Sequence, residues 1–205
     1  MKSFKSFLTE GGLHMFDMDD TLFHTGDKIH VKDKFGNTVQ SLSNQEFNNH
    51  KLPKDHSYDF SEFKNADKFH KEGEPIHPMI NKLKSIQKNV EKKTGSKVII
   101  NTARSDFDKK SKFASKFKKH GIDINKVHVE RAGNIPGNES PAEKKTEVVR
   151  KYLAKEPYKH VTLYDDSKKN LHALLKMKKE YPHVKFHAYH VQPDGTTKKL
   201  NDESN

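Results

Sequence analysis

The 205-residue chain contains no cysteine. It therefore has no disulfide, no thiolate metal site and no cysteine nucleophile. Long apolar runs are lacking too, and none approaches the ~20 residues of a transmembrane helix. The first residues also lack the extended apolar stretch of a secretory signal. These features predict a soluble, cytoplasmic protein without a membrane partner.

Apolar residues are scarce throughout the chain. They make up 31% of the sequence, and the mean hydropathy is −1.02. A chain of this length has enough residues for one real core and a small insertion. We therefore expect a core confined to a few strands and helix faces, under a heavily charged surface.

Positive charge dominates that surface. The formal net charge is +11 and the sequence pI is near 9.5. Such a balance favours polyanionic partners, either nucleic acid or phosphorylated substrates. The lysines are spread widely rather than gathered in one block, so the alternative is a surface that only keeps the protein in solution.

A pair of carboxylates follows the first apolar strand. Residues 13–16 are Leu-His-Met-Phe, and Asp17 and Asp19 come directly after them, with Asp20 next. Like charges at this spacing repel, so such a pair usually needs a cation or a shared proton. The alternative is a pair with a loop or helix-capping role. We interpret Asp20 as such a local loop residue.

Polar residues follow two further apolar strands. The run 97–101 leads into Thr102 and Arg104, and the run 160–164 leads into Asp165 and Asp166. In open α/β sheets, ligands bind beyond the carboxyl ends of the strands. Three such strand ends in one chain predict a single reaction centre.

Strands and helices alternate over most of the chain, which predicts an α/β fold with a parallel sheet covered on both faces. After residues 13–16, the expected strands are 97–101, 127–129, 160–164 and 184–189. One helix is expected to begin at Pro78, and three more are expected at 106–119, 141–154 and 167–180. The predicted organisation is a leader at 1–12, a core at 13–23 and 77–191, an insertion at 24–76 and a frayed tail at 192–205.

The insertion does not show the alternation of strands and helices that the core shows. Residues 29–31 and 38–42 flank Lys-Phe-Gly-Asn, which predicts a β-hairpin. Ser43 and Glu46 form a capping-box pattern that predicts a short helix. Residues 50–75 are polar, and we expect them to be irregular.

These residue types suit the hydrolysis of a phosphate monoester. An aspartate can attack phosphorus and form an aspartyl-phosphate. A second carboxylic acid can protonate the leaving alkoxide and then deprotonate the water that resolves the intermediate. Mg²⁺ relieves carboxylate repulsion and binds a phosphoryl oxygen. A hydroxyl and a lysine hold the remaining oxygens.

Four motifs carry a family resemblance. They are Asp17-x-Asp19-x-Thr21, Thr102, Lys144 or Lys145, and Asp165-Asp166-x-x-x-Asn170. In this order they resemble the motifs of the haloacid dehalogenase-like phosphohydrolases, over roughly residues 13–190. The resemblance implies a Rossmann-like three-layer fold, with the insertion as a small cap.

The resemblance also implies roles for the motif residues. Asp17 is the expected nucleophile and a Mg²⁺ ligand. Asp19 is the expected general acid and base, with its backbone carbonyl on the metal. Thr102 is expected to bind the phosphoryl group. Lys145 precedes two buried helix positions by the family's spacing, so we prefer it to Lys144 as the motif lysine.

The fourth motif supplies the remaining ligands. Asp166 is the expected metal ligand. Asp165 is expected to lie next to the ligands without contacting the metal as closely. Asn170 is expected at the substrate or as a hydrogen-bonding residue that orients these groups. Thr21 and Arg104 are the other candidates for substrate binding. For Arg104 the alternative is a surface salt bridge.

The second carboxylate distinguishes activities within the family. Dehalogenases have no leaving alkoxide to protonate and lack this acid, so Asp19 favours a phosphatase. A small cap leaves the site open, which is compatible with a nucleotide or a nucleic-acid end as substrate. The expected activity is therefore a Mg²⁺-dependent phosphomonoesterase.

The first ten residues carry a separate resemblance. Met-Lys-Ser-Phe-Lys-Ser-Phe-Leu-Thr-Glu resembles the capsid-targeting leaders of T-even-like bacteriophage head proteins. A prohead protease cuts those leaders after Leu-x-Glu, which here would be after Glu10. The alternative is an ordinary N-terminal helix. A true leader would place the protein beside DNA in a virion head, so the competing function is a basic, DNA-associated internal virion protein on a phosphatase-like scaffold.

Overall fold

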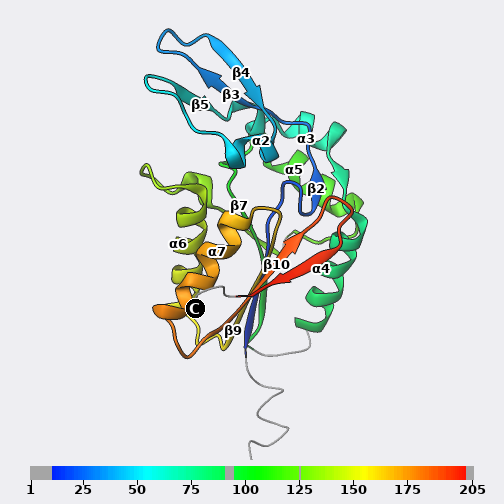
Figure 1. Cartoon of the computed structure of the whole chain (residues 1–205). Coiled ribbons are helices and arrows are strands. Elements are labelled where there is room, and N and C mark those ends of the chain that lie inside the picture. Colours follow the sequence, from blue (N-terminus) through cyan, green and yellow to red (C-terminus); the bar gives the residue numbers. More distant parts are fainter. Residues whose placement is uncertain (1–10, 91–94, 125, 202–205) are drawn as a thin grey trace, which may run out of the picture.

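A six-stranded sheet forms the centre of the molecule (Figure 1). The computed structural model describes residues 11–90, 95–124 and 126–201, so the predicted N-terminal helix and residues 1–10 of the predicted leader lie outside the described residues. The strands, in sheet order, are β11 (Thr197–Leu200), β10 (Lys185–Val191), β9 (His160–Asp165), β1 (Gly12–Phe16), β7 (Lys97–Thr102) and β8 (His128–Arg131). All neighbouring pairs are parallel except β10 with β11.

Helices cover both faces of this sheet. The helices α4 (His77–Val90) and α5 (Lys110–Lys119) lie on one face, and α6 (Pro141–Leu153) and α7 (Lys168–Lys176) lie on the other (Figure 1). Alternation along β1 sends Leu13 and Met15 into the α6–α7 side of the core and Phe16 into the α4–α5 side. The predicted α/β class, with a mostly parallel sheet between helical layers, is confirmed.

The start of α6 is fixed by its sequence. The Ser140 hydroxyl accepts a hydrogen bond from the backbone of Glu143, and the Glu143 carboxylate accepts one from the backbone of Ser140. Pro141 occupies the first turn, where its missing N–H would have no helical partner. This start sets the helical phase that turns Lys145, Val148 and Val149 inward.

The insertion leaves and rejoins the core at one place. The short strands β2 (Phe23–His24) and β6 (Glu74–Pro75) pair antiparallel at its base. Between them lie β3 (Ile29–Lys32), β4 (Thr38–Leu42), α2 (Asn44–Asn49), β5 (Ser57–Asp59), the 3-10 turn η1 (Ser61–Lys64) and α3 (Ala66–Glu72). In Figure 1 the β3–β4–β5 sheet stands beyond one end of the central strands.

The predicted hairpin at 29–42 and the capped helix after Ser43 are both present. The segment 50–75, which we expected to be irregular, instead contains β5, η1 and α3. Its order comes from packing, because Phe63 is buried against the hairpin and Phe69 is buried against Phe113 and Phe117 of α5.

Two other boundaries differ from the sequence prediction. The expected frayed tail contains β11, which forms a hairpin with β10 around Gly195, whose φ is +80°. The helix expected from residue 106 begins at Lys110, because Asp108 bonds to the insertion through Lys64 and Ala66. Among the described residues, each helix is too short or too polar to cross a bilayer.

Candidate functional site

The site lies at the carboxyl ends of three neighbouring strands, β7, β1 and β9. Phe16, the last residue of β1, is in register with Ile100 of β7 and Tyr164 of β9. The chain therefore leaves all three strands at the same edge of the sheet. Continuing this register by one residue places Asp17 level with Asn101 of β7 and Asp165 of β9, and Thr102 is the next residue of β7.

Three carboxylates form an acidic cluster at this edge. Asp17, Asp165 and Asp166 each offer one oxygen, and these oxygens lie within 4.8 Å of one another. Burial raises the pKa of Asp17 to about 7, against the pull of Lys145 and with help from the charges of Asp165 and Asp19. Burial and the neighbouring carboxylates also raise the pKa of Asp166 well above its ordinary value.

Lys145 is the cation of this cluster. Its Nζ lies 2.7 Å from Oδ1 of Asp17 and 2.7 Å from Oδ2 of Asp165, and its side chain is almost fully buried. Burial alone would lower the pKa of Lys145, but the two carboxylates raise it above its ordinary value. Lys144 instead is only half-buried and donates to the carbonyl of Gly137. Of the two candidate lysines, only Lys145 lies in the cluster.

Asp165 is held on several sides. Nδ2 of Asn170 lies 3.0 Å from each of its carboxylate oxygens, and the backbone N–H of Ser167 donates to Oδ1 at 2.8 Å. Asn170 thus orients Asp165, which is one of the two roles we expected for it. Lys145 also bonds to Asp165. Because its oxygens already have these partners, Asp165 is better suited to orient Lys145 than to coordinate a metal ion.

The cluster suits a hard divalent cation. Three carboxylates against the one ammonium of Lys145 leave a formal charge of minus two, which a divalent ion would balance. The donors are all carboxylate oxygens, which are ligands of hard cations such as Mg²⁺ and Ca²⁺. Asp17 and Asp166 are the ligands that this arrangement favours. The side chain of Asp19 is not part of the cluster found among the described residues, and its predicted metal contact is through the backbone.

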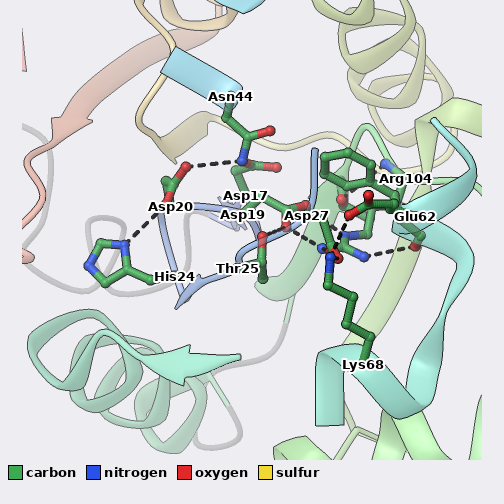
Figure 2. A network of polar contacts seen from close by, with 12 residues as sticks. Asp17, Asp19, Asp20, His24, Thr25, Asp27, Asn44, Glu62, Lys68 and Arg104 are labelled. Atoms are coloured by element: carbon green, nitrogen blue, oxygen red, sulfur yellow. Dashed lines mark hydrogen bonds and ion pairs between the residues drawn. The ribbon is translucent and has the colours of Figure 1, made fainter. Parts of the chain in front are cut away.

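Asp19 forms an ion pair with Arg104, which follows the end of β7. Nε of Arg104 lies 2.8 Å from Oδ2 of Asp19, and Nη2 lies 2.6 Å from Oδ1 (Figure 2). The hydroxyl of Thr25 also donates to Oδ1, at 2.8 Å. Both oxygens of the expected general acid and base are therefore oriented by the protein.

Arg104 has further partners in the insertion. Its Nη2 lies 2.5 Å from Oδ2 of Asp27, and its Nη1 donates to the carbonyl of Phe63 at 2.8 Å. The Arg104 side chain is only 1% exposed. The predicted surface salt bridge is thus a buried ion pair. Binding a substrate phosphate, the other role we expected, would require Arg104 to release one of these partners. Sequence reasoning missed Asp27 altogether.

The two candidate threonines are fully buried. Oγ1 of Thr102 accepts a hydrogen bond from the backbone N–H of Arg104 at 3.2 Å. Oγ1 of Thr21 has no hydrogen-bond partner among the described residues. A substrate contact by Thr21 would require a local shift of the loop.

Asp20 connects this loop to the insertion. Its backbone has φ of 53°, an uncommon conformation for a residue with a side chain. Nδ2 of Asn44, at the start of α2, donates to Oδ2 of Asp20 at 3.0 Å, and Nδ1 of His24 lies 3.1 Å from Oδ1 (Figure 2). Asp20 therefore has the local loop role that its position predicts.

A polar pocket opens beside the acidic cluster. It has a volume of about 330 Å³ and lies between α2, the start of α7 and the end of β10. Its lining includes Asp166, Asn48, Asn49, Lys168, His24 and His190. The pocket therefore adjoins the acidic cluster, and Asp166 belongs to both.

We compared the chain with protein families, curated protein sequences and solved structures, and none of the three comparisons found a match.

Proposed function

We propose that this chain is a Mg²⁺-dependent phosphomonoesterase of the haloacid dehalogenase type, acting through an aspartyl-phosphate on Asp17. The observation that carries the proposal is the contact of Lys145 with both Asp17 and Asp165 inside an acidic cluster at the carboxyl ends of β1 and β9. A buried group with a strongly raised pKa beside a pocket marks a candidate reactive residue.

The first step transfers the phosphoryl group to the protein. A carboxylate oxygen of Asp17 attacks phosphorus, the new P–O bond forms, and the bond between phosphorus and the ester oxygen breaks. Asp19, whose two oxygens accept hydrogen bonds from Arg104 in the resting site, first takes up a proton from solvent and then gives it to the leaving oxygen. Lys145 favours the ionised form of Asp17 and fixes the direction of its carboxylate.

The second step releases phosphate. Water attacks the phosphorus of the aspartyl-phosphate while Asp19 takes its proton, and the phosphorus–Asp17 bond breaks. Orthophosphate leaves, and both aspartates return to their starting forms. When bound at Asp17 and Asp166, Mg²⁺ would lower the pKa of Asp17 and neutralise charge on the phosphoryl oxygens.

The substrate we propose is a nucleotide or a nucleic-acid end. The pocket of about 330 Å³ has the size of a small-molecule site, and its lining offers amide, imidazole and ammonium groups. The net charge of +11 favours anionic substrates of this kind. Action in the cytoplasm of a phage-infected cell remains part of this proposal.

Phosphate release is the test. The panel holds an aryl phosphate, nucleoside monophosphates and oligonucleotides phosphorylated at either end, each with Mg²⁺ and with EDTA. Wild type should turn over at least one member only with Mg²⁺, and Asp17→Asn should abolish that turnover. Asp67→Asn, which changes an exposed carboxylate that pairs with Lys109, is the matched control and should retain it. Turnover that survives Asp17→Asn would overturn the mechanism.

A second candidate function is binding to DNA as an internal virion protein. The observation behind it is the distribution of charge. The insertion 24–76 holds eight lysines against nine acidic residues, so the excess positive charge lies on the rest of the chain. Binding of this kind should weaken steeply between low and moderate salt. A protein that does not bind duplex DNA at low salt would not have this function.

A further inference from the structure

We propose that Asp27 is a positioning residue for Asp19, acting through Arg104, so that the insertion orients the group that protonates the leaving oxygen. The inference rests on the proposed phosphatase function and adds a residue that the sequence motifs do not contain. Figure 2 shows the contacts that carry it.

The guanidinium of Arg104 joins two parts of the chain. On the core side, Nε and Nη2 contact the two oxygens of Asp19, at 2.8 and 2.6 Å. On the insertion side, Nη2 also contacts Oδ2 of Asp27 at 2.5 Å. A guanidinium is planar and its donors point in fixed directions, so Asp27 constrains the plane in which Arg104 meets Asp19.

Asp27 is itself firmly held. It is 3% exposed, and Nζ of Lys68 in α3 lies 3.2 Å from its other oxygen, Oδ1. Lys68 also pairs with Glu62, and Glu62 lies 2.8 Å from Nε2 of His30. Asp27, Lys68 and Glu62 all belong to the insertion, and they form a chain of alternating charge that ends at Arg104 (Figure 2).

The burial of these groups gives the contact its importance. The side chains of Arg104 and Asp27 are 1% and 2% exposed, so water does not readily replace either partner. Removing one member of a buried pair leaves the other without its counter-charge. Without Asp27, Arg104 would have one firm carboxylate partner instead of two, and its direction toward Asp19 would no longer be fixed.

This arrangement predicts a defect confined to one step. Protonation matters for an ester whose leaving oxygen is strongly basic and has little effect on one that leaves readily as an anion. A mispositioned Asp19 should therefore slow the hydrolysis of poor leaving groups only. General loosening of the site would slow both kinds of ester alike.

The experiment compares two aryl esters of similar shape. Phenyl phosphate releases a basic phenolate, whereas dinitrophenyl phosphate releases an anion that needs no proton. We would measure kcat/KM, which reports the steps up to leaving-group departure, for wild type, Asp17→Asn, Asp27→Asn and the control Asp67→Asn. For each variant we would divide kcat/KM on phenyl phosphate by kcat/KM on dinitrophenyl phosphate. Both values come from the same protein sample, so their ratio does not depend on the fraction of folded protein.

For Asp27→Asn we expect kcat/KM on phenyl phosphate to fall about tenfold or more, part of the ~10²–10⁴ that general acid catalysis supplies. Its value on dinitrophenyl phosphate should change less than about threefold, because that ester bypasses the proton transfer. Asp67→Asn should keep the wild-type ratio, since Asp67 pairs with Lys109 and not with Arg104.

Equal losses on both esters in Asp27→Asn would overturn the positioning role, while turnover that Asp17→Asn abolishes would still support the phosphatase. No turnover of either ester by wild type would overturn the proposed function, and with it this inference. Should Asp27→Asn fail to fold, Lys68→Met, which removes the partly exposed cation that holds Asp27, carries the same ratio test. An unchanged ratio there would count against the proposal.

Discussion

The ammonium of Lys145 lies 2.7 Å from a carboxylate oxygen of Asp17, and both side chains are more than nine-tenths buried. This contact joins the first and third sequence motifs, which lie far apart in the chain. It also identifies which of two adjacent lysines lies in the site.

Lys145→Met should abolish phosphate release and lower the unfolding free energy. The change leaves Asp17 and Asp165 without their buried counter-charge, and losing one partner of such a pair costs roughly 3–5 kcal/mol of unfolding free energy. Lys144→Met is the matched control, since Lys144 is half-buried, lies outside the acidic cluster and donates to the carbonyl of Gly137. It should change stability by less than about 0.5 kcal/mol. Urea unfolding and phosphate release measure both effects, and similar behaviour of the two variants would contradict the assignment.

The stability of metal-free protein should depend on the protonation of Asp17. Its folded-state pKa is about 7, above the ordinary 3.8, so the native state binds the proton more tightly than the unfolded state. The contribution of this group is therefore fully present below about pH 4 and is lost as pH rises to about 7. The unfolding free energy of wild type, relative to Asp17→Asn, should fall across that window. A difference that grows with pH would contradict the raised pKa.

Mg²⁺ should stabilise the folded protein by binding the acidic cluster. At a concentration 100 times its Kd, a ligand specific for the folded state adds about 2.7 kcal/mol. We expect a rise in Tm with MgCl₂ that Asp166→Asn removes and Asp67→Asn retains. NaCl at matched ionic strength controls for charge screening. An equal shift in Asp166→Asn would mean that Mg²⁺ binds elsewhere.

Thr21→Val should make the protein more stable. The Thr21 hydroxyl is fully buried without a hydrogen-bond partner among the described residues, and valine has nearly the same shape. Relieving one unsatisfied buried group is worth about 1 kcal/mol or more. Chemical denaturation measures this gain. A loss of stability would show that the hydroxyl has a partner, and a rise in KM alone would support its predicted contact with substrate.

Strand ends were the most predictable part of the site. Asp17, Thr102 and Asp165 each lie at the end of an apolar run, and parallel pairing of β1 with β7 and β9 places these strand ends at one edge of the sheet. The inward phase of Lys145 was predictable as well, because Val148 and Val149 are its buried neighbours on α6. These features depend on local periodicity, which a single sequence records.

Long-range partners were not predictable in the same way. Asp27 lies in a polar stretch with no distinguishing pattern, and its pairing with Arg104 bridges 77 positions. Thr197–Leu200 has no strand-like alternation of apolar residues, and β11 forms because the edge of β10 offers hydrogen bonds. Such contacts depend on how separate segments pack, so they become visible only in three dimensions.

The pairing of Phe23 with Pro75 has a consequence for how this protein could change over time. Directly paired residues in antiparallel strands lie about 5 Å apart, so the whole insertion begins and ends at neighbouring points. A short turn could connect these points, and a much longer segment could replace the present one, while β1 and α4 keep their places. New binding preferences could thus be acquired by exchanging this one module while the acidic cluster of Asp17, Asp165 and Asp166 is kept, provided that the new segment again supplies a carboxylate for Arg104.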